Sequence, residues 1–269
     1  MKVQDKVMVV TGAGSGIGRE LALFLLSKGA RVAGVDLNPK SLEETADLAT
    51  RYEGRFAQFI VNITERRAVE VLPSHVLSRF GAVDGIINNA GIIQPFSTLN
   101  ELDYPTIDRV LNVNLYGTLF VTKAFLPHLL SRPEAHIINL SSMGGFVPVP
   151  GQTIYCAAKA AVKLMSEGLA SELGRSNVRV TVVFPGAVAT NIRENSSVDS
   201  PKKIVDSGDT KALAAAKAAE IIVRGIERDA YHVFVGRDAV LMDKLYRLSP
   251  VHAARTIAAK MRALLPSSS

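Results

Sequence analysis

The amino-acid sequence predicts an α/β fold in which a doubly wound parallel sheet is covered by helices on both faces. Short apolar runs typical of buried strands alternate with longer segments of helical periodicity. The first apolar run leads directly into a glycine-rich turn that opens a helix. The chain has 269 residues, of which 48% are hydrophobic, and no linker divides it, so we expect a single domain over residues 1–269.

Seven strands are expected where runs of Val, Ile, Ala or Phe lie between turn residues. These runs cover residues 7–10, 32–35, 56–61, 83–88, 136–140, 178–184 and 232–235. A helical segment separates each strand from the next, and such a crossover joins parallel strands with a right-handed connection. The alternation therefore predicts a parallel sheet of seven strands.

Helices are expected in the intervening segments, and glycines mark several of their ends. The helix that opens at Gly16 ends before Gly29, and another stops before Gly81. The segment at 155–173 consists of good helix formers and contains no proline. The full set of expected helices covers residues 16–28, 39–52, 65–80, 101–131, 155–173 and 211–228, with a helical extension at 237–269.

Composition excludes several classes of protein. Lys and Arg total 31 against 25 Asp and Glu, but this excess forms no basic stripe, so no nucleic-acid partner is expected. The five histidines are scattered without metal-ligand spacing, so no metal site is expected. Cys156 is the single cysteine and is expected to be a small core residue. The absence of a signal peptide and of an apolar run long enough to span a bilayer predicts a cytoplasmic protein without stable membrane insertion.

The glycine-rich turn predicts a dinucleotide site of the Rossmann type. Gly12, Gly16 and Gly18 follow the first strand, where glycine allows a tight turn and the helix N-terminus can bind a pyrophosphate. Asp36 ends the second strand, where its carboxylate can accept hydrogen bonds from ribose hydroxyls. A 2′-phosphate would meet like charge there, so NAD(H) is the expected cofactor; NADP(H) is the alternative because Arg19 is nearby. A tight turn without a ligand is the simpler interpretation.

Tyr155 and Lys159 are four residues apart on an expected helix, so they lie on the same face. A phenol with a pKa of about 10 is a poor proton acceptor at neutral pH, and a nearby ammonium group lowers that pKa. The pair can therefore act as a general acid/base toward a hydroxyl or carbonyl group. A surface pair without function is the alternative.

Six motifs in the expected order make the sequence similar to the single-domain branch of the short-chain dehydrogenase/reductase family. The resemblance covers residues 5–236 and lies in Thr11–Gly18, Asn88–Gly91, Asn112–Asn114, Asn139–Gly145, Tyr155–Lys159 and Pro185–Thr190. It implies hydride transfer between a nicotinamide cofactor and a secondary alcohol or ketone.

The resemblance also implies a catalytic tetrad. Tyr155 would exchange a proton with the substrate oxygen, and Lys159 would lower the Tyr155 pKa and bind the nicotinamide ribose. Ser142 would hydrogen-bond the substrate oxygen, and Asn114 would hold a water in a proton relay. Asn62 stands where the family usually has Asp, but its carbonyl can still bind the adenine. The expected cofactor contacts are Gly12, Ser15, Gly16, Ile17, Gly18, Asp36, Leu37, Asn62, Ile63, Asn88, Asn89, Ala90, Gly91, Tyr155, Lys159, Pro185, Gly186, Val188 and Thr190.

The substrate is less defined by the sequence. Residues 146–149 are apolar, follow Ser142 and are expected to form a pocket wall, which favours a lipophilic alcohol or ketone. The polar residues 190–210 are expected to form a mobile lid over the substrate. A catalytically silent, cofactor-sensing binding protein is an alternative, but it would have a broken tetrad. A sugar-nucleotide epimerase or dehydratase would have a different glycine turn and a longer chain.

The extension beyond the last strand predicts two amphipathic helices. The first, around residues 240–248, ends before Pro250. The second has an apolar stripe of Val251, Ala254, Ile257, Ala258, Met261, Leu264 and Leu265. We expect this stripe to pack on its own domain or on a partner subunit. Peripheral contact with a membrane surface is the alternative, since basic residues flank the stripe. The resemblance implies a homodimer or homotetramer that pairs through the helices at 101–131 and 155–173.

Overall fold

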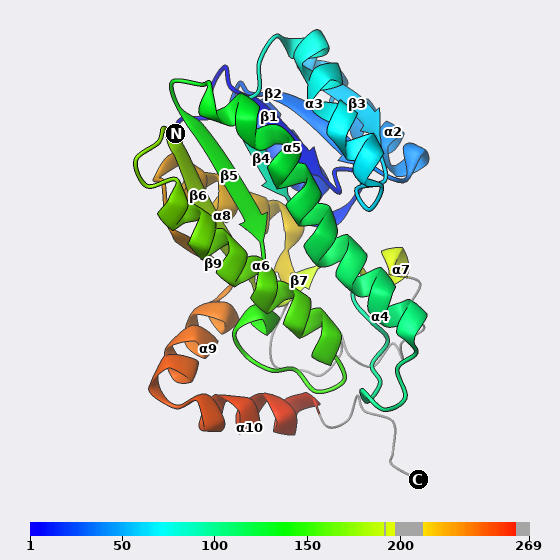
Figure 1. Ribbon diagram of the computed structural model, residues 1–269, viewed down its shortest axis with the longest axis vertical. Coiled ribbons are helices and arrows are strands. Elements are labelled where there is room, and N and C mark those ends of the chain that lie inside the picture. The colour runs from blue at the N-terminus through cyan, green and yellow to red at the C-terminus, as the bar shows by residue number, and fades with distance from the viewer. Residues whose placement is uncertain (191, 197–211, 262–269) are drawn as a thin grey trace.

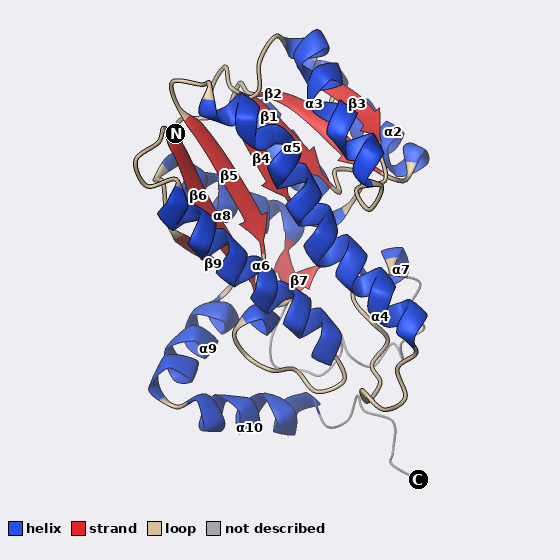
Figure 2. Ribbon diagram, viewed as in Figure 1, coloured by secondary structure: helices blue, strands red, loops and turns tan. Residues whose placement is uncertain are grey.

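The computed structural model describes residues 1–190, 192–196 and 212–261 and confirms the predicted α/β architecture. Figure 1 and Figure 2 show one sheet running through the molecule with helices on both faces. Its seven strands have the order β3-β2-β1-β4-β5-β6-β9, and all neighbouring pairs are parallel. They are β1 (Val7–Thr11), β2 (Arg31–Asp36), β3 (Phe56–Ile60), β4 (Gly85–Asn88), β5 (Ala135–Leu140), β6 (Val178–Pro185) and β9 (His232–Val235).

The composition of strand β1 follows from its place in the middle of the sheet. All five of its residues are buried. Met8 and Val10 pack in the apolar core on one face, while Val7 and Val9 pack in the core on the other. Because side chains alternate between the faces of a strand, a strand covered on both sides must be continuously apolar.

Two groups of helices cover the two faces. The first group contributes Leu21, Leu42 and Ile222 to its core. The second contributes Leu72 and Phe125 to the opposite core. The first group is α1 (Gly16–Ser27), α2 (Pro39–Leu48) and α8 (Ala215–Glu227), and the second is α3 (Arg66–Phe80), α5 (Thr118–Leu130) and α6 (Thr153–Glu172).

The direction of winding reverses between β1 and β4, which are hydrogen-bonded neighbours. The chain builds outward from β1 through β2 to β3, and then from β4 through β5 and β6 to β9 on the other side. The loops that leave β1 and β4 therefore part at the carboxyl ends of the strands. Such a reversal point opens a crevice in which doubly wound folds bind ligands.

The segment at 101–131 was expected to be one continuous helix, but the structure divides it into three parts. It begins as α4 (Tyr104–Leu111), where Asp103 caps the first turn by accepting a hydrogen bond from the Thr106 N–H at 2.8 Å. It then passes through a π-helical turn, η2 (Asn112–Gly117), before continuing as α5. A single wide turn leaves helical periodicity almost unchanged, so the sequence pattern did not reveal it.

The structure also differs from the prediction in several short elements, which are too short for a periodic sequence pattern to detect. The helix expected at 39–52 ends at Leu48, and residues 50–52 form the 3₁₀ turn η1 (Thr50–Tyr52). The helix expected from residue 211 begins at Ala215. A two-stranded parallel sheet of β7 (Val188–Ala189) and β8 (Leu213–Ala214) precedes it. The expected lid contains helix α7 (Ile192–Asn195), while residues 191 and 197–211 lie outside the described part of the chain.

The C-terminal extension forms the two predicted helices, α9 (Arg237–Leu248) and α10 (Pro250–Met261). They create a third apolar core in which Met242 and Ile257 pack with Val147. The stripe is partly wrong, because Val251 is 62% exposed whereas Ala253 is fully buried. Leu264 and Leu265 lie outside the described residues. Among the helices of the described residues, none is long and apolar enough to cross a membrane.

Candidate active site

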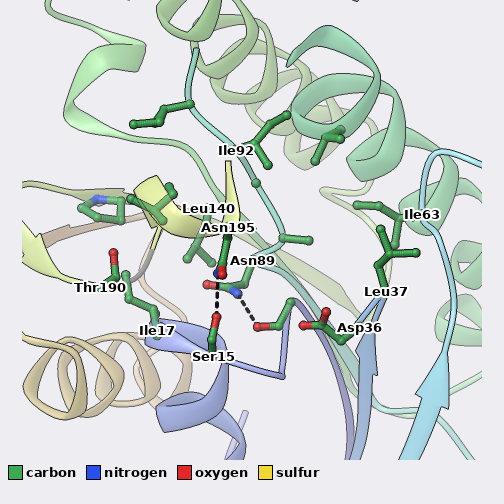
Figure 3. Close-up of a pocket in the computed structure, with 18 of the residues that line it drawn as sticks. Ser15, Ile17, Asp36, Leu37, Ile63, Asn89, Ile92, Leu140, Thr190 and Asn195 are labelled. Carbon is green, nitrogen blue, oxygen red and sulfur yellow. Dashed lines mark hydrogen bonds between the residues drawn. The ribbon is translucent and has the colours of Figure 1, made fainter. Parts of the chain in front are cut away.

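A cleft of about 520 Å³ opens at the reversal point between β1 and β4. Figure 3 shows residues from the glycine-rich turn, the end of β2 and the loop after β4 facing one another across it. The cleft brings together most of the predicted site. It is lined by Gly12, Ser15, Gly16, Ile17, Asp36, Leu37, Asn62, Ile63, Asn89, Ala90, Gly91, Ser142, Tyr155, Lys159, Pro185, Gly186, Val188 and Thr190.

The glycine-rich turn is shaped to accept a phosphate group. Gly12 and Gly16 have φ of +68° and +52°, which favour glycine. Helix α1 starts at Gly16, and Ser15 before it makes no side-chain cap hydrogen bond. The first N–H groups of the helix are therefore directed toward the cleft with the positive end of the helix dipole. Gly18 was expected to touch the cofactor, but it is buried, and an added Cβ would clash with the Gly12 carbonyl.

Of the two neighbouring asparagines that were expected to contact the cofactor, Asn89 lines the cleft and Asn88 does not. Asn89 joins the two loops of the cleft, since its N–H donates to Thr11 Oγ1 at 3.0 Å and its Nδ2 to the Thr11 carbonyl at 2.9 Å. Asn88 does not line the cleft. It is buried behind the cleft, where its Nδ2 donates to Asn139 Oδ1 at 2.8 Å and Thr122 Oγ1 at 3.0 Å.

Asp36 lies at the ribose end of the predicted dinucleotide site. Its Oδ2 accepts a hydrogen bond from the Gly14 N–H at 2.8 Å, which fixes the carboxylate beside the glycine-rich turn. Arg19 is near but already engaged. Its guanidinium donates to Glu44 Oε2 at 2.7 Å and to Thr45 Oγ1 at 3.1 Å. The Arg19 guanidinium near Asp36 is thus paired with Glu44, a residue that no sequence motif singled out.

Tyr155, Lys159 and Ser142 lie together at the other end of the cleft. Lys159 is 4% exposed, and its ammonium donates to the Leu140 carbonyl at 3.0 Å. Burial lowers the Lys159 pKa to about 8. Burial raises the Tyr155 pKa to about 12, although hydrogen bonding to Ser142 acts in the opposite direction. The expected lowering of the Tyr155 pKa by Lys159 is not seen, because desolvation of the phenol dominates.

Asn114 lies behind the cleft rather than on its surface. It is fully buried in the π-helical turn, where its Nδ2 donates to the Ile92 and Val110 carbonyls at 2.8 and 2.9 Å. Gly91 lies between Asn114 and Lys159. A Cβ at Gly91 would lie 2.8 Å from Asn114 Oδ1 and 3.2 Å from Lys159 Nζ. The glycine therefore allows the two side chains to approach each other. The π turn places the asparagine there, as such turns often do at functional sites.

Several residues of the cleft escaped the sequence analysis because they meet it only through tertiary contacts. Asn195 of α7 donates to Ser15 Oγ at 2.8 Å, a bond drawn in Figure 3. Ser196 is buried and accepts a hydrogen bond from the Ile93 N–H at 3.0 Å. These bonds hold α7 against both cofactor-facing loops. Further lining residues are Val35, Asn38, Ser41, Val61, Ile92, Ile93, Val113, Leu140, Ser141, Ile192 and Asn195.

The apolar segment after Ser142 does not form the expected pocket wall. Val147 is fully buried in the core that α9 and α10 make, and Pro148 is exposed. Phe146 packs edge-on against Phe184 and Tyr246, with ring centroids 5.5 and 6.3 Å apart. The segment therefore anchors the C-terminal extension. The apolar part of the cleft comes from isoleucines in the loop after β4 and in α7 instead.

Comparisons with known proteins identify the family of the chain. The family model described as short chain dehydrogenase matches residues 6–201. A Mycobacterium tuberculosis protein with the name "Putative oxidoreductase SadH" is 36% identical over 270 residues, covering 98% of both chains. The 3-oxoacyl-[acyl-carrier-protein] reductase FabG of Thermotoga maritima is 34% identical over 194 residues, which cover 72% of this chain and 78% of that protein.

Solved structures show the same fold. A short chain dehydrogenase/reductase from Burkholderia phymatum in complex with NAD superposes with a TM-score of 0.83 at 25% identity, covering 94% of this chain and 96% of that one. A 3-ketoacyl-(acyl-carrier-protein) reductase from Brucella melitensis complexed with NADH gives 0.78 at 28% identity, covering 87% and 97%. Sequence and fold agree, and the chain belongs to the short-chain dehydrogenase family of oxidoreductases.

Proposed function

We propose that this protein is an NAD(P)-dependent dehydrogenase or reductase that acts on a secondary alcohol or ketone, with Tyr155 as the general acid/base. One observation carries the proposal. A single cleft joins a phosphate-accepting glycine turn at one end to Tyr155, Ser142 and Lys159 at the other. A relative named as a 3-oxoacyl-[acyl-carrier-protein] reductase and structural neighbours in complex with NAD or NADH support the same activity.

The residues of the cleft fit a dinucleotide. The N–H groups at the start of α1 would bind its pyrophosphate, and Asp36 would accept hydrogen bonds from a ribose. Pro185, Gly186 and Val188 would meet the nicotinamide amide, and Lys159 the neighbouring ribose. When bound, the nicotinamide ring supplies or accepts the hydride.

The protein residues in this scheme move the proton and stabilise charge. The Tyr155 hydroxyl gives a proton to the substrate oxygen during reduction and takes it back during oxidation. The Ser142 hydroxyl donates a hydrogen bond to that oxygen as charge develops on it. The Lys159 ammonium, held by the Leu140 carbonyl, places positive charge beside the phenol. Asn114 would hold the water that links Lys159 to solvent.

We also propose NAD(H) as the preferred cofactor and a lipophilic substrate. Asp36 places a negative charge where NADP would carry a phosphate, and Glu44 occupies Arg19. Ile92, Ile93 and Ile192 give the substrate end of the cleft an apolar wall.

For assembly, we propose a cytoplasmic homodimer or homotetramer. Tyr116 is 45% exposed and Leu164 on α6 is 68% exposed, and both lie on the two helical segments that the family resemblance pairs between subunits. Light scattering on the purified protein reports the number of subunits. A monomer would contradict this part of the proposal.

The activity is tested with a panel of secondary alcohols and ketones, including long-chain and steroid compounds, followed at the nicotinamide absorbance with NAD and NADP. On the best substrate, Tyr155→Phe should lower kcat by about 10²–10⁴, the usual contribution of general acid–base catalysis. NADH binding, followed by fluorescence, should stay near the wild-type value. A near wild-type kcat in Tyr155→Phe would overturn the proposal. NADH binding without turnover of any compound would favour a cofactor-sensing protein.

A further inference from the structure

Gln94 is a buried amide in the loop that leaves β4, and all its side-chain hydrogen bonds reach toward α6. The side chain is fully buried. Its Oε1 accepts hydrogen bonds from the N–H groups of Ile154 at 2.9 Å and of Tyr155 at 3.0 Å. Its Nε2 donates to the Gly151 carbonyl at 3.1 Å. These contacts join two parts of the chain that lie 60 and 61 residues apart.

This arrangement supplies a helix cap that the local sequence lacks. Helix α6 begins at Thr153, and Gln152 at its N-cap makes no side-chain cap hydrogen bond. The second and third N–H groups of a helix are the ones that an N-cap side chain normally satisfies. In α6 these belong to Ile154 and Tyr155, and Gln94 satisfies both. The backbone of the proposed general acid/base is therefore fixed by a residue from another loop.

The loop that carries Gln94 is itself held by hydrogen bonds to two further buried side chains, Asn114 and Gln152. Ile92 donates its N–H to Asn114 Oδ1 at 3.3 Å and accepts from Asn114 Nδ2 at 2.8 Å. The Gln94 carbonyl accepts a hydrogen bond from Gln152 Nε2 at 2.8 Å. Gly91, Ile92 and Ile93 of the same loop line the cleft. Gln94 thus connects the cleft-facing loop to the first turn of α6.

We propose that Gln94 is a positioning residue for Tyr155. It caps α6 from the loop that lines the cleft and so keeps the phenol in its reactive place. The inference rests on the proposed function of Tyr155 as the general acid/base. Tyr155 lies in the first turn of its helix, where helices fray and where four N–H groups have no partner within the helix. Loss of the cap would let the phenol move, and displacement of about 1 Å can cost about 100-fold in rate.

Gln152 provides a matched control. It is also a glutamine, is 4% exposed and lies in the same cluster. Its Nε2 donates to the carbonyls of Gln94 and Gly151 at 2.8 and 3.1 Å, while its Oε1 has no hydrogen-bond partner in the described structure. It makes no side-chain bond to the N–H groups of Ile154 or Tyr155. Replacing either glutamine by methionine removes a buried amide of the same size.

The cap itself is tested by hydrogen exchange of a peptide that spans residues 152–160, which needs no substrate. Gln94→Met should speed exchange in the first turn of α6 about fivefold to tenfold, as expected for the loss of one N-cap. Gln94→Glu should restore protection, because a carboxyl group can accept both hydrogen bonds. Gln152→Met removes a hydrogen bond to the Gln94 carbonyl but leaves both bonds to the α6 N–H groups, so it should speed this exchange less than Gln94→Met does. Equal exchange in Gln94→Met and wild type would overturn the cap.

Catalysis is tested on the best substrate of the panel. Gln94→Met should lower kcat about tenfold or more while the NADH dissociation constant stays unchanged, and Gln94→Glu should recover turnover. Gln152→Met should lower kcat less than Gln94→Met does, because the bonds from Gln94 to the Ile154 and Tyr155 N–H groups remain. An equal loss of kcat in both methionine variants, or wild-type turnover in Gln94→Met, would overturn this inference alone. Retained turnover in Tyr155→Phe would overturn the proposed function, and with it the catalytic reason for the cap.

Discussion

The Arg19–Glu44 ion pair lies beside Asp36, near the place that the additional phosphate of NADP would take in the proposed mode of binding. Arg19 is on the first turn of α1, close enough to Asp36 that both groups meet the Gly14 backbone. A free guanidinium there would attract a phosphate, whereas the pair with Glu44 at 2.7 Å competes for it. Glu44 is 52% exposed, so the pair is weak in stability but still fixes the direction of the guanidinium.

The first prediction in this region concerns cofactor preference. The wild-type kcat/KM should be higher with NAD than with NADP. Glu44→Gln should raise kcat/KM for NADP about threefold to tenfold by releasing Arg19, and the combination with Asp36→Asn should raise it further. Glu43→Gln makes the same charge change on an exposed neighbouring residue and should have little effect. A wild-type preference for NADP, or equal effects of the Glu43 and Glu44 variants, would contradict this assignment.

At the level of residues, the sequence predicted the groups whose spacing is local. Tyr155 and Lys159 are one helical turn apart, and the glycines of the turn are within seven residues of one another, so both could be identified from sequence motifs. Gln94, Glu44 and Asn195 act through partners from 25 to 180 residues away. No spacing rule connects such pairs. The Tyr155 pKa was misjudged for a related reason, because burial is a property of the packed molecule.

At the level of elements, helices α9 and α10 contact two segments that lie next to the cleft. Met242 and Ile257 cover Val147, which follows Ser142, a proposed catalytic residue, by five residues. Asp238 in the first turn of α9 accepts a hydrogen bond from the Ala187 N–H at 2.7 Å. Ala187 lies between Gly186 and Val188, both of which line the cleft. The extension therefore contacts two segments next to the cleft, through packing on Val147 and through the hydrogen bond to Ala187.

Truncation separates the roles of the two helices. A chain that stops after Ser249 loses α10 and should lose about 2 kcal/mol or more of stability, since Ile257 no longer covers Val147 and Met242. It keeps the Asp238–Ala187 hydrogen bond and should bind NADH normally. A chain that stops after Gly236 loses both and should be less stable still, with weaker NADH binding. Urea unfolding and NADH fluorescence measure these effects.

The membrane alternative for the extension gives the opposite result. If the chain cut after Gly236 keeps its unfolding midpoint, oligomeric state and activity and loses only binding to anionic liposomes, then α10 is an interfacial helix. The buried positions of Ala253 and Ile257 favour packing within the protein. Exposed Leu241, Leu248 and Val251 are the residues that such a membrane contact would use.

The elements show where periodicity succeeds and fails. Strand β1 was predicted from its short continuous apolar run, and helix α6 from a long run of good helix formers without proline. The π turn at residues 112–117 was missed because one additional residue per turn barely disturbs the repeat. Strands β7 and β8 have two residues each, too few to show alternation. In the tail stripe, Val251 is exposed because it opens α10, before the helix reaches the core.

For the whole molecule, two layers of helices on one sheet leave some polar side chains deep in the interior. His136 of β5 is fully buried, and its Nε2 lies 2.8 Å from Thr181 Oγ1 on β6. Burial lowers its pKa from 6.5 to about 4, even though Asp229, 3.6 Å from Nδ1, acts to raise it. Arg179 and the N-terminal ammonium act in the same direction as burial. The folded protein therefore holds this histidine neutral.

Because His136 is held neutral, the folded protein should lose stability when the pH falls below about 6.5, and replacing His136 should reduce that loss. The unfolded chain binds the His136 proton near pH 6.5 and the folded protein only near pH 4, so the contribution is fully present above about pH 6.5 and is lost as pH falls to about 4. A shift of this size corresponds to a loss of about 3 kcal/mol at most.

The variant His136→Gln tests this prediction. Its amide can still donate to Thr181 and does not titrate, so the free energy of unfolding of this variant should fall less between pH 7 and pH 4.5 than that of the wild type. Urea unfolding at both pH values measures this difference, with His75→Gln, which changes an exposed histidine, as the control. If His136→Gln loses as much stability on acidification as the wild type and His75→Gln, then the carboxylates rather than His136 govern the acid side of the stability profile.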